Sequence, residues 1–183
     1  IDPSSGAVLT NGIDLRDLDL YSARSSKAIV TQDIFLFSDT INSNLDKGQK
    51  GQILQEILEQ SARDAAAHDF ISKLSDGYDT VIGEKGVGLS GGQKQRVSIA
   101  RALASGRPLL IFDDATSALD METEKMVQKA IRKHGKITMM IIAHRISAVR
   151  DADEIIILDH GRIAERGTHD QLMALKGSYY HTY

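Results

Sequence analysis

Short apolar runs alternate along this chain with stretches of helical periodicity. Four runs are rich in β-branched or other apolar side chains: Ala28–Val30, Leu109–Phe112, Ile137–Ala143 and Glu154–Leu158. Continuous apolar runs of this length are typical of strands that are buried on both faces of a parallel sheet. The pattern therefore predicts an α/β protein.

The helical stretches lie between and after these runs. They are Gly51–Ala67 with a continuation over Ala65–Leu74, a helix from Ser90 that stops at Gly106–Pro108, and two later helices over Met121–His134 and Thr168–Leu175. The first three stretches fall between the first and second strands, which predicts a helical lobe inserted into the sheet. After the last helix, Ser178–Tyr180 is expected to be a packing tail.

A polar residue follows directly, or nearly so, after three of the four predicted strands. These residues are Gln32, the pair Asp113 and Asp114, and His144. Open α/β sheets bind their ligands beyond the carboxyl ends of the strands. We therefore expect these four side chains to share one site, although an apolar strand meeting a polar turn is common in any buried sheet.

Composition narrows the class of protein. With 183 residues the chain suits one domain, or one domain with an inserted lobe. A formal charge of −3 and a pI near 6.1 give no basic surface for nucleic acid. The absence of Cys excludes disulfides and thiolate metal sites. The apolar runs are far shorter than the roughly 20 residues of a membrane helix, and the first residues show no signal-peptide pattern.

One short segment offers a specific binding geometry. Ser90, Gly91 and Gly92 come at the start of a predicted helix, so that backbone N–H groups stand there without a Cβ to keep an anion away. The sequence therefore predicts a phosphate-binding corner, whereas an isolated Gly pair is more often a plain junction between loop and helix.

Five motifs, in order along the chain, resemble those of the ABC ATPases. Leu89–Gln93 is similar to the signature motif of that family, and Gly83–Gln93 is similar to its form in exporters. The other matches are Gln32–Ile41 with the Q-loop, Leu109–Asp114 with the Walker B strand, Ala115–Asp120 with the D-loop and Ile141–Arg145 with the H-loop.

The resemblance implies a P-loop NTPase (RecA-like) core with an inserted α-helical subdomain. Residues 1–45 and 106–183, with a C-terminal helix, would form the core, and residues 46–105 would form the helical subdomain that carries the signature motif. It also implies binding of ATP and Mg²⁺, with Asp113 and Gln32 as metal ligands and with Asp114, His144 and Gln32 as catalytic residues. Five residues would contact ATP: Ser90, Gly91, Gly92, Gln93 and Asp120.

The sequence departs from the family pattern in two places. Asp114 stands where the family usually has the Glu that orients or deprotonates the attacking water, and its carboxylate is shorter by roughly 1.3–1.5 Å, which predicts a weakened site. No Gly-x-x-x-x-Gly-Lys-Ser/Thr pattern, the P-loop or Walker A motif, occurs in the sequence. We expect the chain to lack the Walker A strand, loop and helix, either because it is a fragment or because the protein is naturally split.

The leading hypothesis is an ATPase domain of an ABC exporter that works only as a complete dimer, with this chain alone inactive. Its signature motif would serve ATP held by a second nucleotide-binding domain, as in the degenerate half of a heterodimer. A transmembrane domain would contact Gln32–Ile41 and Glu84 and would tether the chain to the cytoplasmic face of a membrane. The alternatives are a non-hydrolysing regulatory module and a soluble ABC ATPase. From the residues alone, Phe35 and Phe37 are expected to be core or groove-lining residues, and the resemblance alone implies their contact with a membrane domain. Glu84 beside glycines is usually just solvated.

Overall fold

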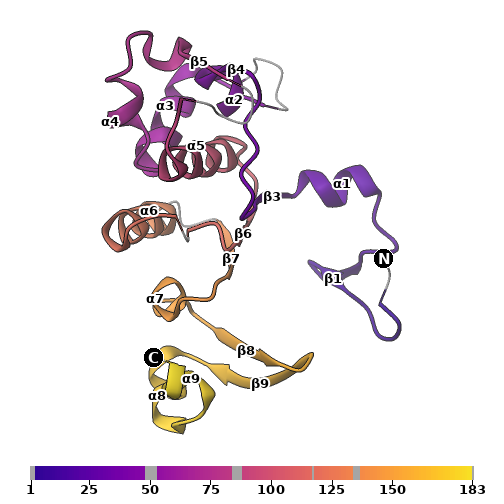
Figure 1. Cartoon of the computed structure of the whole chain (residues 1–183). Helices are drawn as coiled ribbons and strands as arrows, with labels where there is room; N and C mark the ends of the chain where they lie inside the picture. Colours follow the sequence, from indigo (N-terminus) through magenta and orange to yellow (C-terminus); the bar gives the residue numbers. More distant parts are fainter. Residues whose placement is uncertain (1–2, 48–52, 84–87, 117, 134–136, 183) are drawn as a thin grey trace.

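In Figure 1 the helical lobe, a small parallel sheet and a C-terminal unit lie one below another, while β1 (Leu9–Thr10) and α1 (Leu20–Ser25) near the N-terminus project to the side. The computed structural model describes residues 3–47, 53–83, 88–116, 118–133 and 137–182. The strands are β1 (Leu9–Thr10), β2 (Ile13–Asp14), β3 (Lys27–Val30), β4 (Asp39–Thr40), β5 (Val81–Ile82), β6 (Leu109–Asp113), β7 (Thr138–Ile142), β8 (Ile155–Asp159) and β9 (Arg162–Gly167). The helices are α1 (Leu20–Ser25), α2 (Ile41–Leu45), α3 (Gln55–Asp64), α4 (His68–Ile71), the 3₁₀ helix η1 (Gly77–Asp79), α5 (Gly91–Ala104), α6 (Met121–Lys133), α7 (Ile146–Val149), α8 (His169–Leu175) and α9 (Ser178–Thr182).

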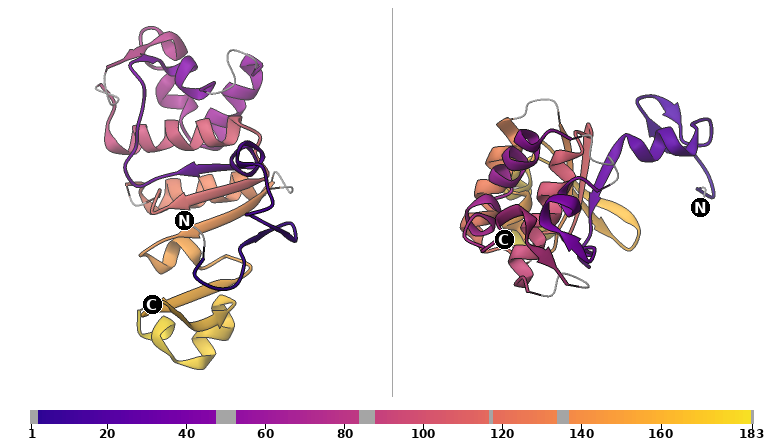
Figure 2. Two further views of the ribbon diagram at one scale, coloured as in Figure 1. Left: turned by 90° about the vertical axis from the view of Figure 1, so that its right-hand side faces the viewer. Right: turned by 90° about the horizontal axis from the view of Figure 1, so that it is seen from above.

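Three of the predicted strands form one parallel sheet in the order β3-β6-β7. Val30 lies opposite Phe112, and Phe112 lies opposite Ile141, so all three strands end at the same edge. Figure 2 shows them side by side, with α5 next to β3. The predicted parallel arrangement of these strands is therefore confirmed.

The fourth predicted strand does not join that sheet in the part of the chain that the structure describes. β8 pairs with β9 in an antiparallel hairpin. The turn between them is His160-Gly161, with φ values of 46° and 74°. Two consecutive positive φ angles match the twist of a tight hairpin. The local turn thus gives β8 a neighbour that its apolar composition alone did not indicate.

The helical lobe contains α2 to α5, with the short antiparallel pair β4-β5 beside them. The predicted helix over Ala65–Leu74 is wrong at both ends, because α3 ends at Asp64 and α4 covers only His68–Ile71. Ala66 between them has a φ of 54°. Its carbonyl oxygen accepts a hydrogen bond of 2.9 Å from the Arg96 guanidinium of α5. This tertiary contact holds the break in the helix.

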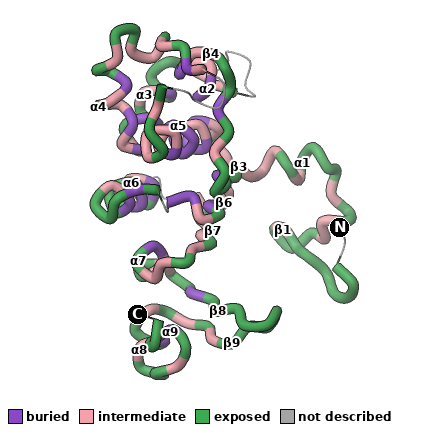
Figure 3. The backbone as a smooth tube through the Cα atoms, viewed as in Figure 1, coloured by how far each residue is buried: buried purple, intermediate pink, exposed green. Residues whose placement is uncertain are grey.

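The main hydrophobic core spans the lobe and the sheet. Figure 3 shows buried residues concentrated along α5, at the inner side of α6 and in β6. Val97, Ile99, Leu110 and Phe112 are among its members, each at most 2% exposed. A second, smaller cluster holds the C-terminal unit together around Tyr179, so the packing tail predicted over Ser178–Tyr180 is confirmed.

Candidate functional site

The carboxyl ends of β3, β6 and β7 bring the predicted strand-end residues to one edge of the sheet. Gln32 follows β3 by two residues, Asp113 ends β6 opposite Ile142, and His144 follows β7 by two residues. All three side chains are exposed there, while Asp114 is half-buried. The register thus places together the residues that the sequence assigned to one site.

Asp114 has an unusual backbone conformation at this edge. Its φ is 47°, in the left-handed region, which Asp tolerates better than most residues other than Gly. Its amide donates a 2.8 Å hydrogen bond to the carbonyl of Ile142. This bond continues the β6-β7 ladder one residue past the strand, so the sheet itself fixes where the Asp114 side chain begins.

Asp113 and Gln32 are suited to Mg²⁺ as oxygen donors. Mg²⁺ usually takes only one or two protein oxygens and keeps water or phosphate oxygens for its remaining positions. In the described ranges no cluster of three or more His, Cys, Asp or Glu side chains converges on a metal site. One carboxylate and one amide oxygen at the sheet edge are donors that Mg²⁺ accepts, and their binding of the cation remains a prediction.

The N-terminus of α5 is built as a helix start with an open face. Ser90 is its N-cap: the Ser90 hydroxyl accepts from the Gln93 amide at 3.3 Å, and the Gln93 side-chain oxygen accepts from the Ser90 amide at 2.9 Å. This capping box fixes the first turn. A Cβ added at Gly91 would meet nothing within 4 Å, whereas one at Gly92 would lie 3.3 Å from the carbonyl oxygen of Ala118.

These two glycines therefore have different reasons to lack a side chain. Gly92 is restricted by its own chain, because Ala118 leaves little room. Gly91 is exposed and unrestricted by the chain. The first N–H groups of a helix have no partner within the helix and attract anions. The open backbone at Gly91 is thus the feature of this corner that points outward to a ligand.

Asp120 has a structural role that the sequence reasoning missed. Its carboxylate accepts hydrogen bonds from the Thr123 amide at 2.9 Å and the Thr123 hydroxyl at 2.7 Å, which caps the start of α6. These bonds, the one from the amide first, lower the pKa of Asp120. The spacing Asp-x-x-Thr before a helix was the available signal. A contact of Asp120 with ATP remains a prediction.

The segment after Gln32 presents two aromatic rings at the surface. Phe35 and Phe37 are 53% and 38% exposed and meet edge to face at 4.9 Å, and the Lys47 ammonium lies 4.3 Å from the Phe37 ring centroid. The fully buried Asn44 fixes the segment by accepting from the Phe37 amide at 2.8 Å and donating to the Phe37 carbonyl at 3.0 Å. Glu84, the other residue assigned to a membrane-domain contact, lies outside the described residues.

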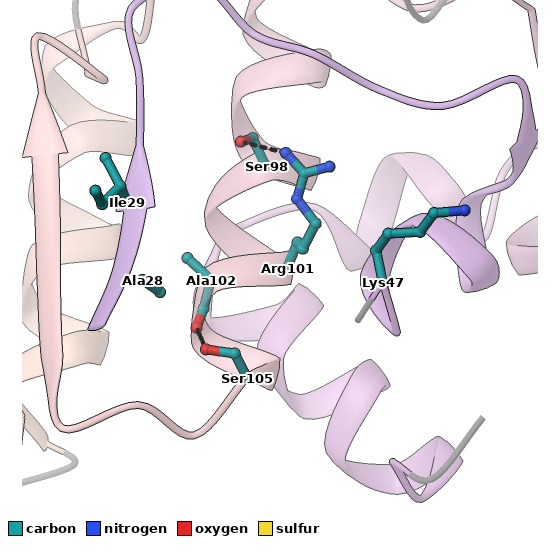
Figure 4. A pocket seen from close by; sticks show the side chains of 7 residues that line it. All are labelled: Ala28, Ile29, Lys47, Ser98, Arg101, Ala102 and Ser105. Atoms are coloured by element: carbon teal, nitrogen blue, oxygen red, sulfur yellow. Dashed lines mark hydrogen bonds between the residues drawn. The ribbon is translucent and has the colours of Figure 1, made fainter. Parts of the chain in front are cut away.

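A cavity of about 190 Å³ between β3 and the second half of α5 lies away from these positions. In Figure 4 Arg101 turns toward Ser98, while Lys47 points away from it. Arg101 donates to the Phe35 carbonyl at 3.0 Å and to the Ser98 hydroxyl at 3.3 Å, and burial lowers its pKa. The two cations do not converge, and none of the predicted site residues lines the cavity.

Comparison with known proteins identifies the family of the chain. The family model described as ABC transporter matches residues 1–117. The chain belongs to the ABC transporter family. It accordingly has the P-loop NTPase fold of an ABC ATPase domain, with mixed helix and sheet.

Relatives of this ABC transporter chain include export proteins. It is 48% identical over 179 residues to the ATP-dependent lipid A-core flippase of Pasteurella multocida (strain Pm70) and 50% identical over 180 residues to that of Syntrophus aciditrophicus (strain SB). These matches cover 97% and 98% of this chain but only 31% and 30% of the relatives. YgaD of Bacillus subtilis (strain 168), named as a multidrug export ATP-binding/permease protein, is 47% identical over 183 residues, which are 100% of this chain and 31% of YgaD.

A solved structure gives the same assignment. The structure of a bacterial Atm1-family ABC exporter with ATP bound superimposes with a TM-score of 0.93 and 43% sequence identity. The match covers 99% of this chain and 32% of the exporter chain. This ABC transporter chain thus spans about a third of the length of its relatives. None of the helices described for it is long and apolar enough to span a bilayer.

Proposed function

We propose that this chain is the ATP-binding domain of an ABC exporter and couples ATP binding and hydrolysis to transport across a membrane. The observation that carries the proposal is the open N-terminus of α5, where Gly91 presents backbone to solvent with nothing of its own chain nearby. This corner lies on α5 and not at the strand ends. It can therefore contact a different ATP molecule from the one at the strand-end residues, namely ATP held by a second nucleotide-binding domain. Ser90 and Gln93 keep the corner in shape, and Gly91 and Gly92 allow phosphate to approach.

The strand-end residues have separate roles in this proposal. Asp113 and Gln32 hold Mg²⁺, which neutralises phosphate charge when bound. His144, exposed beyond β7, donates a hydrogen bond to the γ-phosphate. Asp114 is the general base or the residue that orients water. Its side chain is one methylene shorter than Glu and starts from a backbone fixed by Ile142, so its reach is limited. Asp120 adds a contact to ATP from the D-loop.

The assembly follows from this division of roles. Residues 1–45 and 106–183 form the core, and residues 46–105 form the helical subdomain. The partner is a second nucleotide-binding domain, and this chain is the half of a heterodimer whose own site is weakened by Asp114. A transmembrane domain contacts the segment Gln32–Ile41, where Phe35 and Phe37 are exposed, together with Glu84. That domain holds the chain at the cytoplasmic face of the membrane, and hydrolysis requires the complete dimer.

Asp114 also favours a second candidate function. If its short side chain cannot reach the attacking water, this half binds nucleotide without hydrolysing it and regulates its partner. Replacement of Asp114 by Glu in the assembled transporter separates a weakened hydrolytic site from a purely regulatory one.

The test compares two substitutions in the full-length protein produced with its partner. Gly91→Asp places a negative charge at the first position of α5, where it suits the helix dipole but repels phosphate. We expect it to abolish ATP hydrolysis while the protein remains folded. Asp113→Asn, which damages only the chain's own site, is expected to leave most of the hydrolysis in place. The reverse order of effects would contradict the proposal, and equal loss in both variants would show that the chain's own site also hydrolyses ATP.

A further inference from the structure

Three buried polar side chains lie close to the proposed site, but the roles assigned above do not use them. Gln95 is 1% exposed, Glu124 is 2% exposed and Thr116 is 6% exposed. A buried polar group is costly unless it is hydrogen-bonded, and a buried carboxylate also needs a positive partner. Their contacts show why the chain keeps them.

Glu124 connects helix α6 with the segments that follow β6 and β7. One of its carboxylate oxygens accepts a hydrogen bond from the Thr116 hydroxyl, and the other lies 3.4 Å from the Arg145 guanidinium. The same guanidinium nitrogen donates to the Thr116 carbonyl at 2.6 Å. Arg145, Thr116 and Glu124 therefore form a closed triangle of polar contacts. Arg145 enters this triangle from the solvent side, since its side chain is 38% exposed.

The same segment is fastened on its other side to α5. The Ala118 amide donates to the Gln95 side-chain oxygen at 3.1 Å. The Ala118 carbonyl lies close enough to Gly92 that an added Cβ would be 3.3 Å away. The segment between β6 and α6 is thus held from both sides. Gln95 of α5 holds it on one side, and Arg145, the residue after His144, holds it on the other.

These contacts join the three places that the proposed function assigns to nucleotide. Thr116 comes two residues after Asp114, Arg145 directly follows His144, and Gln95 lies on the helix that starts at Gly91. A shift in any one of these segments would be passed to the other two through the polar contacts. Displacements of the order of 1 Å at a catalytic group can cost about a hundredfold in rate.

We propose that Glu124 and Arg145 are positioning residues that set the backbone after β6 and the place of His144, without touching nucleotide themselves. The pair acts by holding the Thr116 carbonyl and hydroxyl at the same time. An apolar replacement of equal volume would fill the space but could not fix the turn in this way. The inference rests on the proposed function, because its kinetic consequence requires that the assembled protein hydrolyses ATP.

The experiment uses the full-length protein assembled with its partner and the variants Glu124→Gln, Arg145→Met and the two combined. Glu122→Gln and Arg150→Met are matched controls, because Glu122 lies on the exposed face of the first turn of α6 and Arg150 is exposed after α7. Because most of the hydrolysis is expected at the ATP that the α5 corner serves, and Gln95 joins that corner to this segment, we expect each single change to lower kcat for ATP by about tenfold to a hundredfold, with KM changed less than about twofold. The double variant should lose no more than the worse single variant, and the controls should stay at the level of the unmodified protein.

Hydrogen exchange provides a readout that does not depend on activity. In Glu124→Gln and Arg145→Met, the amides of residues 115–120 should exchange faster, while those of α8 should not change. If the unmodified protein hydrolyses no ATP, the proposed function fails, and the exchange result alone decides whether the contacts hold the segment. Should Glu124→Gln fail to fold, Arg145→Met is compared with Arg145→Lys, which keeps the charge and should recover part of kcat. Unchanged exchange at residues 115–120, or a loss of kcat no larger than in the controls, would overturn the inference.

Discussion

Replacing Gly91 by Ala separates what the chain needs from what the ligand needs at the start of α5. The change adds one methyl group at an exposed position that has no neighbour within 4 Å. Gly91 also lacks a positive φ, so Ala can adopt its conformation. Replacing Gly by Ala under such conditions stabilises a protein by about 0.4–1 kcal/mol, chiefly by reducing the freedom of the unfolded chain.

The same change at Gly92 supplies the comparison. Its added methyl group would lie 3.3 Å from the Ala118 carbonyl, so the turn before α6 must shift by a few tenths of an ångström. Overpacking of this kind costs about 1–3 kcal/mol, which offsets the gain in chain entropy. We therefore expect Gly91→Ala to raise the unfolding midpoint slightly and Gly92→Ala to lower it.

ATP turnover of Gly91→Ala should change in the opposite direction from its stability. A methyl group at Gly91 occupies the space through which a phosphate would reach the first amides of α5. We expect ATP turnover of the assembled transporter to fall at least tenfold in Gly91→Ala, which is about 1.4 kcal/mol of lost transition-state stabilisation, although the protein is no less stable. Denaturant unfolding and steady-state ATP hydrolysis measure the two effects on the same preparations.

Two results would refute this reasoning. Full turnover in Gly91→Ala would mean that no ligand approaches the open corner. A loss of stability of about 1 kcal/mol or more in the same variant would mean that the space around Gly91 is not open, since Ala is favoured over Gly in helices.

Two further predictions concern the strand-end carboxylate and a half-buried tyrosine. Asp114→Glu should raise ATP turnover of the complete assembly, because it restores roughly 1.3–1.5 Å of reach. The gain in total turnover should be about twofold at most, since most of the hydrolysis is expected at the ATP held by the partner and a restored second site adds no more than an equal share. Unchanged turnover would show that Asp114 does not limit that site, and Asp113→Glu, which alters the metal ligand, should not raise it. Burial raises the pKa of Tyr78 to about 12. Its neutral phenol therefore contributes stability that is complete below about pH 10, the usual pKa of Tyr, and is lost as pH rises through about 12. Unfolding midpoints measured up to that pH should show this loss in the unmodified protein but not in Tyr78→Phe, and equal alkaline loss in both would contradict the assignment.

The parts of the structure that followed from sequence depend on local patterns. The strands predicted over Ala28–Val30, Leu109–Phe112 and Ile137–Ala143 are found as β3, β6 and β7, because uninterrupted apolar runs mark buried parallel strands. The start of α5 was predicted because Ser90 and the following glycines carry a helix-start signal in a few adjacent residues. The order of strand ends then brought the predicted site residues to one edge without further information.

The parts that did not follow from sequence depend on partners distant in the chain. The break at Ala66 is held by Arg96, which lies 30 residues away. The triangle of Glu124, Arg145 and Thr116 joins segments that have no common motif. A Glu in a helix is usually solvated, so nothing in its local sequence distinguished Glu124 from the exposed Glu122. The pairing of β8 with β9 differs from these, because the adjacent turn at His160-Gly161 decides it and not a distant partner.

The division of the apolar interior into two clusters has a consequence for how the chain unfolds. The main cluster joins the sheet to the helical lobe, whereas the C-terminal cluster has, among the described residues, three buried members: Ile155, Leu172 and Tyr179. Proteins open locally in cooperative units whose stability reflects the apolar contacts that each unit makes. The hairpin β8-β9 with α8 and α9 should therefore behave as a separate unit, whose amides lose protection at lower denaturant concentration than those of α5. Local unfolding would therefore expose this end of the chain to proteases and quality-control factors while the rest remains folded.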